Sequence, residues 1–422
     1  MNIVATLEHG MDRPWRPWYR TALRGLAVLL GVATLAACGS GVNVGGGQGG
    51  APVFGPSPVS TGLNLPRPDR PLVDEFGRQL APGAARVAIL LPLSGDTGQL
   101  GQQMLNAAEM ALFEIASRDF ELIPLDTGGT ADGARIAAQT AVQQGAELIL
   151  GPLFSGSVRP ATQVAAPYNV NLVAFTTDAN TAGGNAFVMG ILPQAQVERV
   201  MAFGANRGIR NYAVLAPDTT YGQLIASAMQ QAGPRLGANV AVTQFYPQDA
   251  DNYGQYVEAI QGSSGSFEAI MLPDVGLRLR QVAPLIPYYY MRDEQIVGTG
   301  LWDGAGVEIE PALHGAWYAA PPPGLRRDFE VRYERDYGVA PPRLATLAYD
   351  AVALAASLAQ NTMPGRFGRQ ALTDPSGFNG LDGIFRFGQN GLVERGFAIL
   401  EITPNGAEVI DPAPSGFGGP IF

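Results

Sequence analysis

From residue 84 onwards, short apolar runs alternate with segments whose apolar residues recur every three or four positions. The run at 86–92 is apolar almost throughout, which is typical of a strand covered on both faces. A helical spacing of apolar residues follows at 104–115. Regular alternation of strand and helix favours crossover connections, which pair strands in parallel. The sequence therefore predicts an α/β fold with parallel sheets.

The alternation restarts half-way along the chain, which predicts two Rossmann-like lobes. Strands are expected at 121–125, 147–150 and 172–175, then again at 212–215, 240–245 and 269–272. A long apolar helix is expected at 344–359, and a hairpin around Asn390–Gly391 that ends in a strand at 398–402. We expect lobe 1 at about 84–198 and 325–365, and lobe 2 at about 199–315 and 366–422. A hinge would join the lobes and leave a cleft between them.

The first 83 residues have a different character. Residues 1–37 contain arginines followed by a short apolar run, and Leu35-Ala36-Ala37-Cys38 is similar to a lipobox. This order predicts a lipoprotein signal peptide and lipidation of Cys38; an ordinary signal peptide with an incidental cysteine is the alternative. Residues 39–83 are rich in glycine and proline, which predicts a flexible, disordered tether. No later apolar run is long enough to predict a membrane span.

Composition excludes several classes of function. All 27 basic residues are arginine, so Schiff-base chemistry on lysine is excluded. One cysteine and two histidines cannot build a zinc site of the Cys/His type. A net charge of −10 without a basic cluster argues against a nucleic-acid partner. No catalytic motif is recognisable, so we expect a protein that is not an enzyme and uses no cofactor or metal.

The loops that follow the predicted strands are the places to look for a binding site, because open parallel sheets bind ligands at the carboxyl ends of their strands. Serine hydroxyls at a helix start suit a carboxylate, an aspartate suits an ammonium group, and aromatic rings can cover the rest of a solute. The candidate ligand-binding residues are Ser94, Ser155, Ser157, Thr176, Thr177, Asp178, Tyr221, Asp274 and Trp302.

Each candidate also has an ordinary structural interpretation. Ser155 or Ser157 can cap a helix, and Asp274 can do the same. Asp178 can be a turn residue. Tyr221 can pack within a loop, and Trp302 can belong to the core instead of covering a ligand.

The segment 86–360 resembles the type I periplasmic binding proteins of the leucine/isoleucine/valine-binding kind. The resemblance is carried by 88–95, 151–157, 176–178, 221–222 and 273–276. The sequence segments 190–196, 298–302 and 382–387 are most similar to the penicillin-binding protein activator lipoproteins. The resemblance implies two lobes joined by a three-strand hinge that close on a solute. It places an amino-acid ligand at Ser155, Thr176, Asp178 and Tyr221.

Two functions follow from these observations. The first is a lipid-anchored, non-catalytic receptor in the periplasm that binds a small polar solute such as an amino acid and serves transport with an ABC permease. The second is an activator that contacts a penicillin-binding protein and regulates peptidoglycan synthesis, with no ligand required in the cleft. Gly39 follows Cys38 where an acidic residue would favour the inner membrane, so the outer membrane of a Gram-negative bacterium is the expected location.

Overall fold

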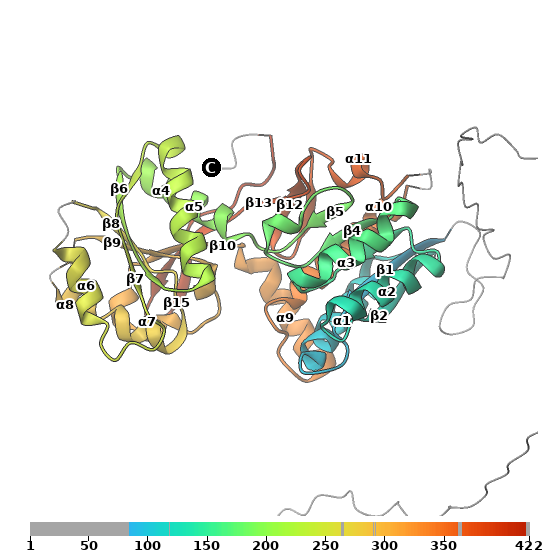
Figure 1. Cartoon of the computed structure of the whole chain (residues 1–422), viewed down its shortest axis with the longest axis horizontal. Helices are drawn as coiled ribbons and strands as arrows, with labels where there is room; N and C mark the ends of the chain where they lie inside the picture. The colour runs from blue at the N-terminus through green and yellow to red at the C-terminus, as the bar shows by residue number, and fades with distance from the viewer. Residues whose placement is uncertain are drawn as a thin grey trace, which may run out of the picture. The chain divides into compact units, whose positions relative to one another are not determined.

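The computed structural model describes residues 84–418, except 118, 263–265, 290, 292 and 362–364 (Figure 1). The predicted signal peptide at 1–37, the predicted lipidation site Cys38 and the predicted tether at 39–83 lie outside the described residues. Two lobes are present, each an α/β unit with its own sheet, as the sequence predicts.

The sheet of lobe 1 has five parallel strands, in the order β2 (Phe120–Asp126), β1 (Ala85–Leu91), β3 (Leu148–Leu150), β4 (Asn171–Ala174) and β5 (Ala186–Val188). Helices cover both faces, which explains why β1 is apolar apart from Arg86. One face packs against α1 (Gly98–Ile115), α9 (Pro323–Tyr337) and α10 (Ala345–Ala359). The other packs against α2 (Ala131–Gln143) and α3 (Ser155–Ala165).

The sheet of lobe 2 has seven strands, in the order β15 (Gly406–Asp411), β14 (Ala398–Thr403), β10 (Trp317–Ala320), β9 (Gln295–Gly298), β8 (Ala269–Met271), β6 (Asn211–Pro217) and β7 (Asn239–Tyr246). The strands from β10 to β7 are parallel, and β14 and β15 are antiparallel additions. One face packs against α4 (Pro193–Asn206) and α5 (Thr220–Leu236). The other packs against α6 (Gly254–Gln261), α7 (Gly276–Val282) and α8 (Leu285–Tyr288).

The segment after α10 differs from the expected division of the chain. We expected 366–422 to belong to lobe 2. Instead α11 (Arg369–Leu372) and a small sheet of β11 (Phe378–Gly380), β12 (Gly383–Phe387) and β13 (Val393–Arg395) contribute apolar side chains to the core of lobe 1. Alternate side chains of β12 cause this, since Phe385 and Phe387 are buried there and Phe387 meets Phe187 edge-on at 5.4 Å.

The expected hairpin is therefore only half right. The turn at Asn390–Gly391 connects β12 to β13, while 398–402 lies in the sheet of lobe 2. Short 3-10 helices complete the fold at Ala166–Tyr168, Ala179–Thr181, Gly300–Trp302 (η3), Val307–Ile309 and Pro311–Leu313. Among the described residues, no helix combines the length and hydropathy that crossing a membrane requires.

The chain passes between the lobes at 189–192, 321–322 and 396–397, which are the three crossings that the resemblance implies. After β15 it crosses once more, from lobe 2 back to the β11–β13 sheet. The Phe417 ring lies against Gly377, where an added Cβ would be 2.5 Å from the ring. The guanidinium of Arg386 lies 4.6 Å from the centroid of the same ring. The C-terminal segment thus contacts both lobes.

A buried group of charges lies where α10 meets the small sheet. Asp350 of α10 accepts a hydrogen bond of 2.7 Å from the backbone N–H of Leu381, and its carboxylate is 4.0 Å from Arg395. Asp382 accepts a 2.7 Å hydrogen bond from the hydroxyl of Thr346 and pairs with Arg343 at 2.9 Å. Such charges are tolerated in a core only because they neutralise one another.

This group predicts a pH dependence of stability. Burial and then the charge of Asp382 raise the pKa of Asp350 to about 7, whereas the carboxyl ionises near pH ~4 in an unfolded chain. The folded protein therefore keeps this proton to a higher pH than the unfolded chain. Its contribution to stability is complete below about pH 4 and is lost as the pH rises towards the folded-state pKa.

Urea unfolding of the wild type and the Asp350→Asn variant between about pH 4 and pH 8 measures this contribution. The unfolding constant of the wild type should rise relative to that of the variant by at most about tenfold per pH unit, and level off above neutrality. A difference between the two proteins that stays constant over this range would contradict the prediction.

Candidate functional site

The loops of lobe 1 gather at one edge because β1, β3 and β4 are parallel neighbours. Ser94 follows β1, Ser155 opens α3 after β3, and Thr177 follows β4; all three residues are exposed. Phe154, the residue before α3, provides no side-chain hydrogen bond to the helix start. The Ser94 side chain bonds the Asp126 carboxylate. The lobe therefore presents the hydroxyls of Ser155 and Thr177 together with the first turn of a helix, a combination that favours an anionic group.

Three other candidates of this edge are engaged in local structure. The hydroxyl of the buried Ser157 donates to the carbonyl of Thr130 at 3.2 Å. The hydroxyl oxygen of Thr176 accepts from the backbone N–H of Asp178 at 3.0 Å, and Asp178 accepts from the backbone N–H of Asn180 at 3.0 Å. Ser157 and Thr176 thus order the loops, while the half-buried Asp178 still brings a negative charge to the edge.

Asp126 at the end of β2 was not among the predicted residues, although it shapes the Ser94 loop. Its Oδ1 accepts hydrogen bonds from the backbone N–H groups of Leu93 at 2.8 Å, Ser94 at 3.2 Å and Gly128 at 2.7 Å. Burial opposes the charge, but these bonds and one from the Ser94 side chain lower the pKa of Asp126. An acidic residue at the end of an edge strand was the available signal in the sequence.

In lobe 2 the loops after β6 and β9 are connected by side chains. The hydroxyl of Tyr221 donates to Thr299 Oγ1 at 2.9 Å. Burial raises the pKa of Tyr221 to about 12, so the hydroxyl remains a donor at neutral pH. Thr299 is buried and begins the short helix η3. Tyr221 is therefore held at the edge of the lobe by a fixed hydrogen bond.

Asp274 and Trp302 are buried within lobe 2 and bonded to neighbouring side chains and backbone. Asp274 is 3% exposed, accepts from the hydroxyl of Tyr246 at 2.8 Å, and binds the guanidinium of Arg278 through bonds of 2.8 and 2.9 Å. Its charge is thus already neutralised. Trp302 is 1% exposed and donates its Nε1–H to the carbonyl of Asp274 at 2.9 Å. The two residues thus connect the loops after β8 and β9.

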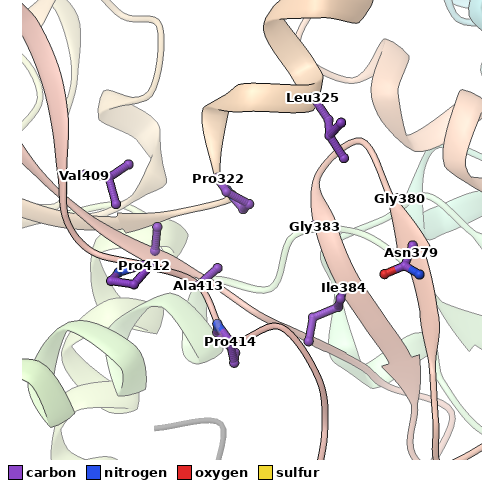
Figure 2. A pocket seen from close by; sticks show the side chains of 11 residues that line it. Pro322, Leu325, Asn379, Gly380, Gly383, Ile384, Val409, Pro412, Ala413 and Pro414 are labelled. Atoms are coloured by element: carbon purple, nitrogen blue, oxygen red, sulfur yellow. The ribbon is translucent and has the colours of Figure 1, made fainter.

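A separate cavity of about 350 Å³ lies where the crossing segments meet (Figure 2). Figure 2 shows the side chains of Pro322, Ile384 and Pro414 around it, from three different segments of the chain. None of the nine candidate residues lines this cavity. The candidate site therefore consists of the loops at the strand ends of lobe 1 and lobe 2.

A family model described as periplasmic binding protein matches residues 84–407. The chain belongs to the periplasmic binding protein family. The match covers both lobes and all nine candidate residues. It agrees with the two-lobe architecture and with the resemblance that the loop motifs carry.

Relatives in sequence include penicillin-binding protein activators. The activator LpoA of Haemophilus ducreyi is 25% identical over 338 residues, which cover 76% of this periplasmic binding protein and 54% of the relative. LpoA of Mannheimia succiniciproducens is 27% identical over 39% of this chain and 29% of the relative. An uncharacterized protein of Rickettsia prowazekii is 23% identical over 44% of this chain and 48% of its own length. The chain spans about half or less of the curated relatives it matches.

Solved structures of solute-binding proteins share the fold. A protein of Rhodospirillum rubrum, described as a branched-chain amino acid ABC transporter, superimposes with a TM-score of 0.69 at 20% identity, covering 78% of this chain and 100% of the other. A leucine-binding protein of Thermotoga maritima superimposes with a TM-score of 0.56 at 17% identity, covering 78% of this chain and 98% of the other. A substrate-binding protein of Desulfitobacterium hafniense in complex with leucine superimposes with a TM-score of 0.58 at 16% identity, covering 77% of this chain and 99% of the other.

Proposed function

We propose that this periplasmic binding protein binds a small polar solute such as an amino acid between its two lobes and performs no chemistry on it. The observation that carries the proposal is the edge of lobe 1, where exposed hydroxyls of Ser155 and Thr177 accompany the uncapped start of α3. A carboxylate fits this arrangement, Asp178 fits an ammonium group, and Tyr221 supplies an aromatic face from lobe 2.

The direct test is calorimetry of the purified protein against a panel of amino acids and short peptides. A saturable heat with one member supports a solute receptor, and a protein partner such as an ABC permease would then be sought. The absence of binding across the whole panel would count against the proposal.

Replacement of Ser155 by alanine should weaken solute binding. A hydroxyl that bonds a charged group contributes about 1–2 kcal/mol, which corresponds to a loss of affinity of roughly 5- to 30-fold. Calorimetry of Ser155→Ala measures the loss, and Ser227→Ala serves as a matched control because Ser227 is an exposed serine in the middle of α5. Equal affinities of Ser155→Ala and the wild type would remove Ser155 from the site.

A second candidate function is activation of a penicillin-binding protein in peptidoglycan synthesis. It is favoured by the match to LpoA of Haemophilus ducreyi, which extends over 76% of this chain. Pull-down with bifunctional penicillin-binding proteins and a glycan polymerisation assay test this function. Absence of both binding and a change in polymerisation rate would reject it.

We also propose that the protein is held at the outer membrane by a lipid on Cys38. The order of arginines, short apolar run and small residues before Cys38 supports this. Incorporation of labelled palmitate, lost in Cys38→Ala, tests the anchor, and membrane fractionation locates it. Equal labelling of the variant would contradict lipidation at this residue.

A further inference from the structure

Asp303 of lobe 2 is bound by arginines of lobe 1. It follows Trp302, whose ring lies in the core of lobe 2. The carboxylate of Asp303 accepts two bonds from the guanidinium of Arg326, at 2.7 and 2.8 Å, and one from Arg343 Nε at 3.3 Å. The Asp303 side chain is 7% exposed and that of Arg326 is 10% exposed. The pairing is therefore largely removed from water.

Both arginines are fixed to lobe 1. Arg326 lies on α9, whose Phe329 and Tyr333 pack in the core of that lobe. Arg343 precedes α10 and also holds Asp382 at 2.9 Å, in the loop between β11 and β12. The ion pairs thus cross from one lobe to the other, in addition to the covalent crossings of the chain.

A buried ion pair of this kind behaves as a discrete contact. Separating the partners inside a water-poor junction leaves uncompensated charges, which is costly unless the junction opens and water reaches them. Breaking the Asp303 contacts is therefore linked to a movement of the lobes. Packed interfaces of this type change between distinct arrangements and do not deform gradually.

We propose that Asp303 is an interlobe latch, which holds the two lobes at the angle of this structure while it is paired with Arg326 and Arg343. The proposal deepens the proposed function, and it rests on that function only where a change of lobe angle alters solute affinity.

The latch is connected to the candidate site through η3. Thr299, the partner of Tyr221, caps this short helix, and Asp303 follows it directly. Trp302 anchors the same turn through its bond to the carbonyl of Asp274. A solute that shifts Tyr221 therefore acts on the segment that carries the latch, since one turn of helix separates Thr299 from Asp303.

The test is the distance between the lobes measured by pulsed electron paramagnetic resonance in the absence of solute. Spin labels are placed on the full chain at Gln143→Cys on α2 and Gln230→Cys on α5, both exposed positions, with Cys38→Ser to remove the remaining thiol. Asp303→Asn should produce a second population of distances that the parent lacks. The control Glu121→Gln removes an ion pair with Arg86 inside lobe 1 and should leave the parent distribution.

Asp303→Asn with the parent distribution, in a sample whose circular dichroism is unchanged, would overturn the latch. If that variant does not fold, Arg326→Gln is measured instead, because it removes the two shorter of the three bonds to Asp303. A second distance population in Arg326→Gln supports the latch, and an unchanged distribution rejects it. Since these measurements contain no solute, their result is independent of whether the panel of amino acids yields a ligand.

Discussion

Replacing Arg395 by methionine is expected to lower the free energy of unfolding by about 3–5 kcal/mol, the usual cost of removing one partner from a buried group of charges. The Arg395 side chain is 1% exposed and Asp350 beside it is fully buried. The arginine also donates to the carbonyl of Met189 at 3.0 Å and stacks 5.0 Å from the Phe385 ring. Methionine retains much of the apolar contact and removes the positive charge.

A second replacement separates charge from packing. At pH 8, above the folded-state pKa of Asp350, the Arg395→Met/Asp350→Asn variant removes a buried negative charge, so about 1–3 kcal/mol of the loss should be recovered. Urea unfolding followed by circular dichroism measures all three variants, including Asp350→Asn alone. A further loss in the double variant would show that the effect of Arg395 is due to shape and not to charge.

Gly101→Ala is expected to destabilise lobe 1 by about 3 kcal/mol, at the upper end of the range for overpacking. Gly101 lies in the first turn of α1, and an added Cβ would be 2.0 Å from the carbonyl oxygen of Pro92. That oxygen belongs to the chain leaving β1, so neither partner can move without displacing the helix from the sheet. An added Cβ at Gly133 in α2 or Gly222 in α5 would likewise lie 2.0 or 2.1 Å from a preceding carbonyl oxygen, which indicates a recurrent close approach of helix and strand end.

The matched control is Gly156→Ala in the first turn of α3, where an added Cβ meets nothing within 4 Å. Alanine should stabilise this position by about 0.4–1 kcal/mol, because it restricts the unfolded chain without a clash. Thermal unfolding of both variants measures the contrast. Equal melting temperatures would show that α1 can withdraw from Pro92 without cost.

The sequence predicted the fold well because its signals are local. The apolar run of β1 and the helical spacing in α1 each report how a short segment is buried, and their alternation implies parallel pairing. The division between lobes after α10 was predicted less well. Phe385 and Phe387 alternate as in any half-buried strand, and this pattern does not indicate which of two cores receives them.

For the candidate site, the sequence placed Ser94, Ser155 and Thr177 in loops after parallel strands, and the structure has them there at one edge of the sheet. It did not separate Asp178 from Asp274, because both are aspartates that follow strands. Only the structure shows that Arg278 neutralises Asp274. The sequence left two interpretations of Trp302, core residue or cover of a ligand, and the structure shows its side chain buried in lobe 2.

By itself, the sequence determined the α/β class, the two lobes and the strand ends where a solute is expected. The reason is that the spacing of apolar residues along the chain reflects which side chains are buried. The tertiary structure decided which side chains meet across long separations. The contacts of Asp303 with Arg326 and Arg343 join residues from different lobes. No periodicity encodes such a contact, since it depends on how independently formed elements pack and on which charges that packing removes from water.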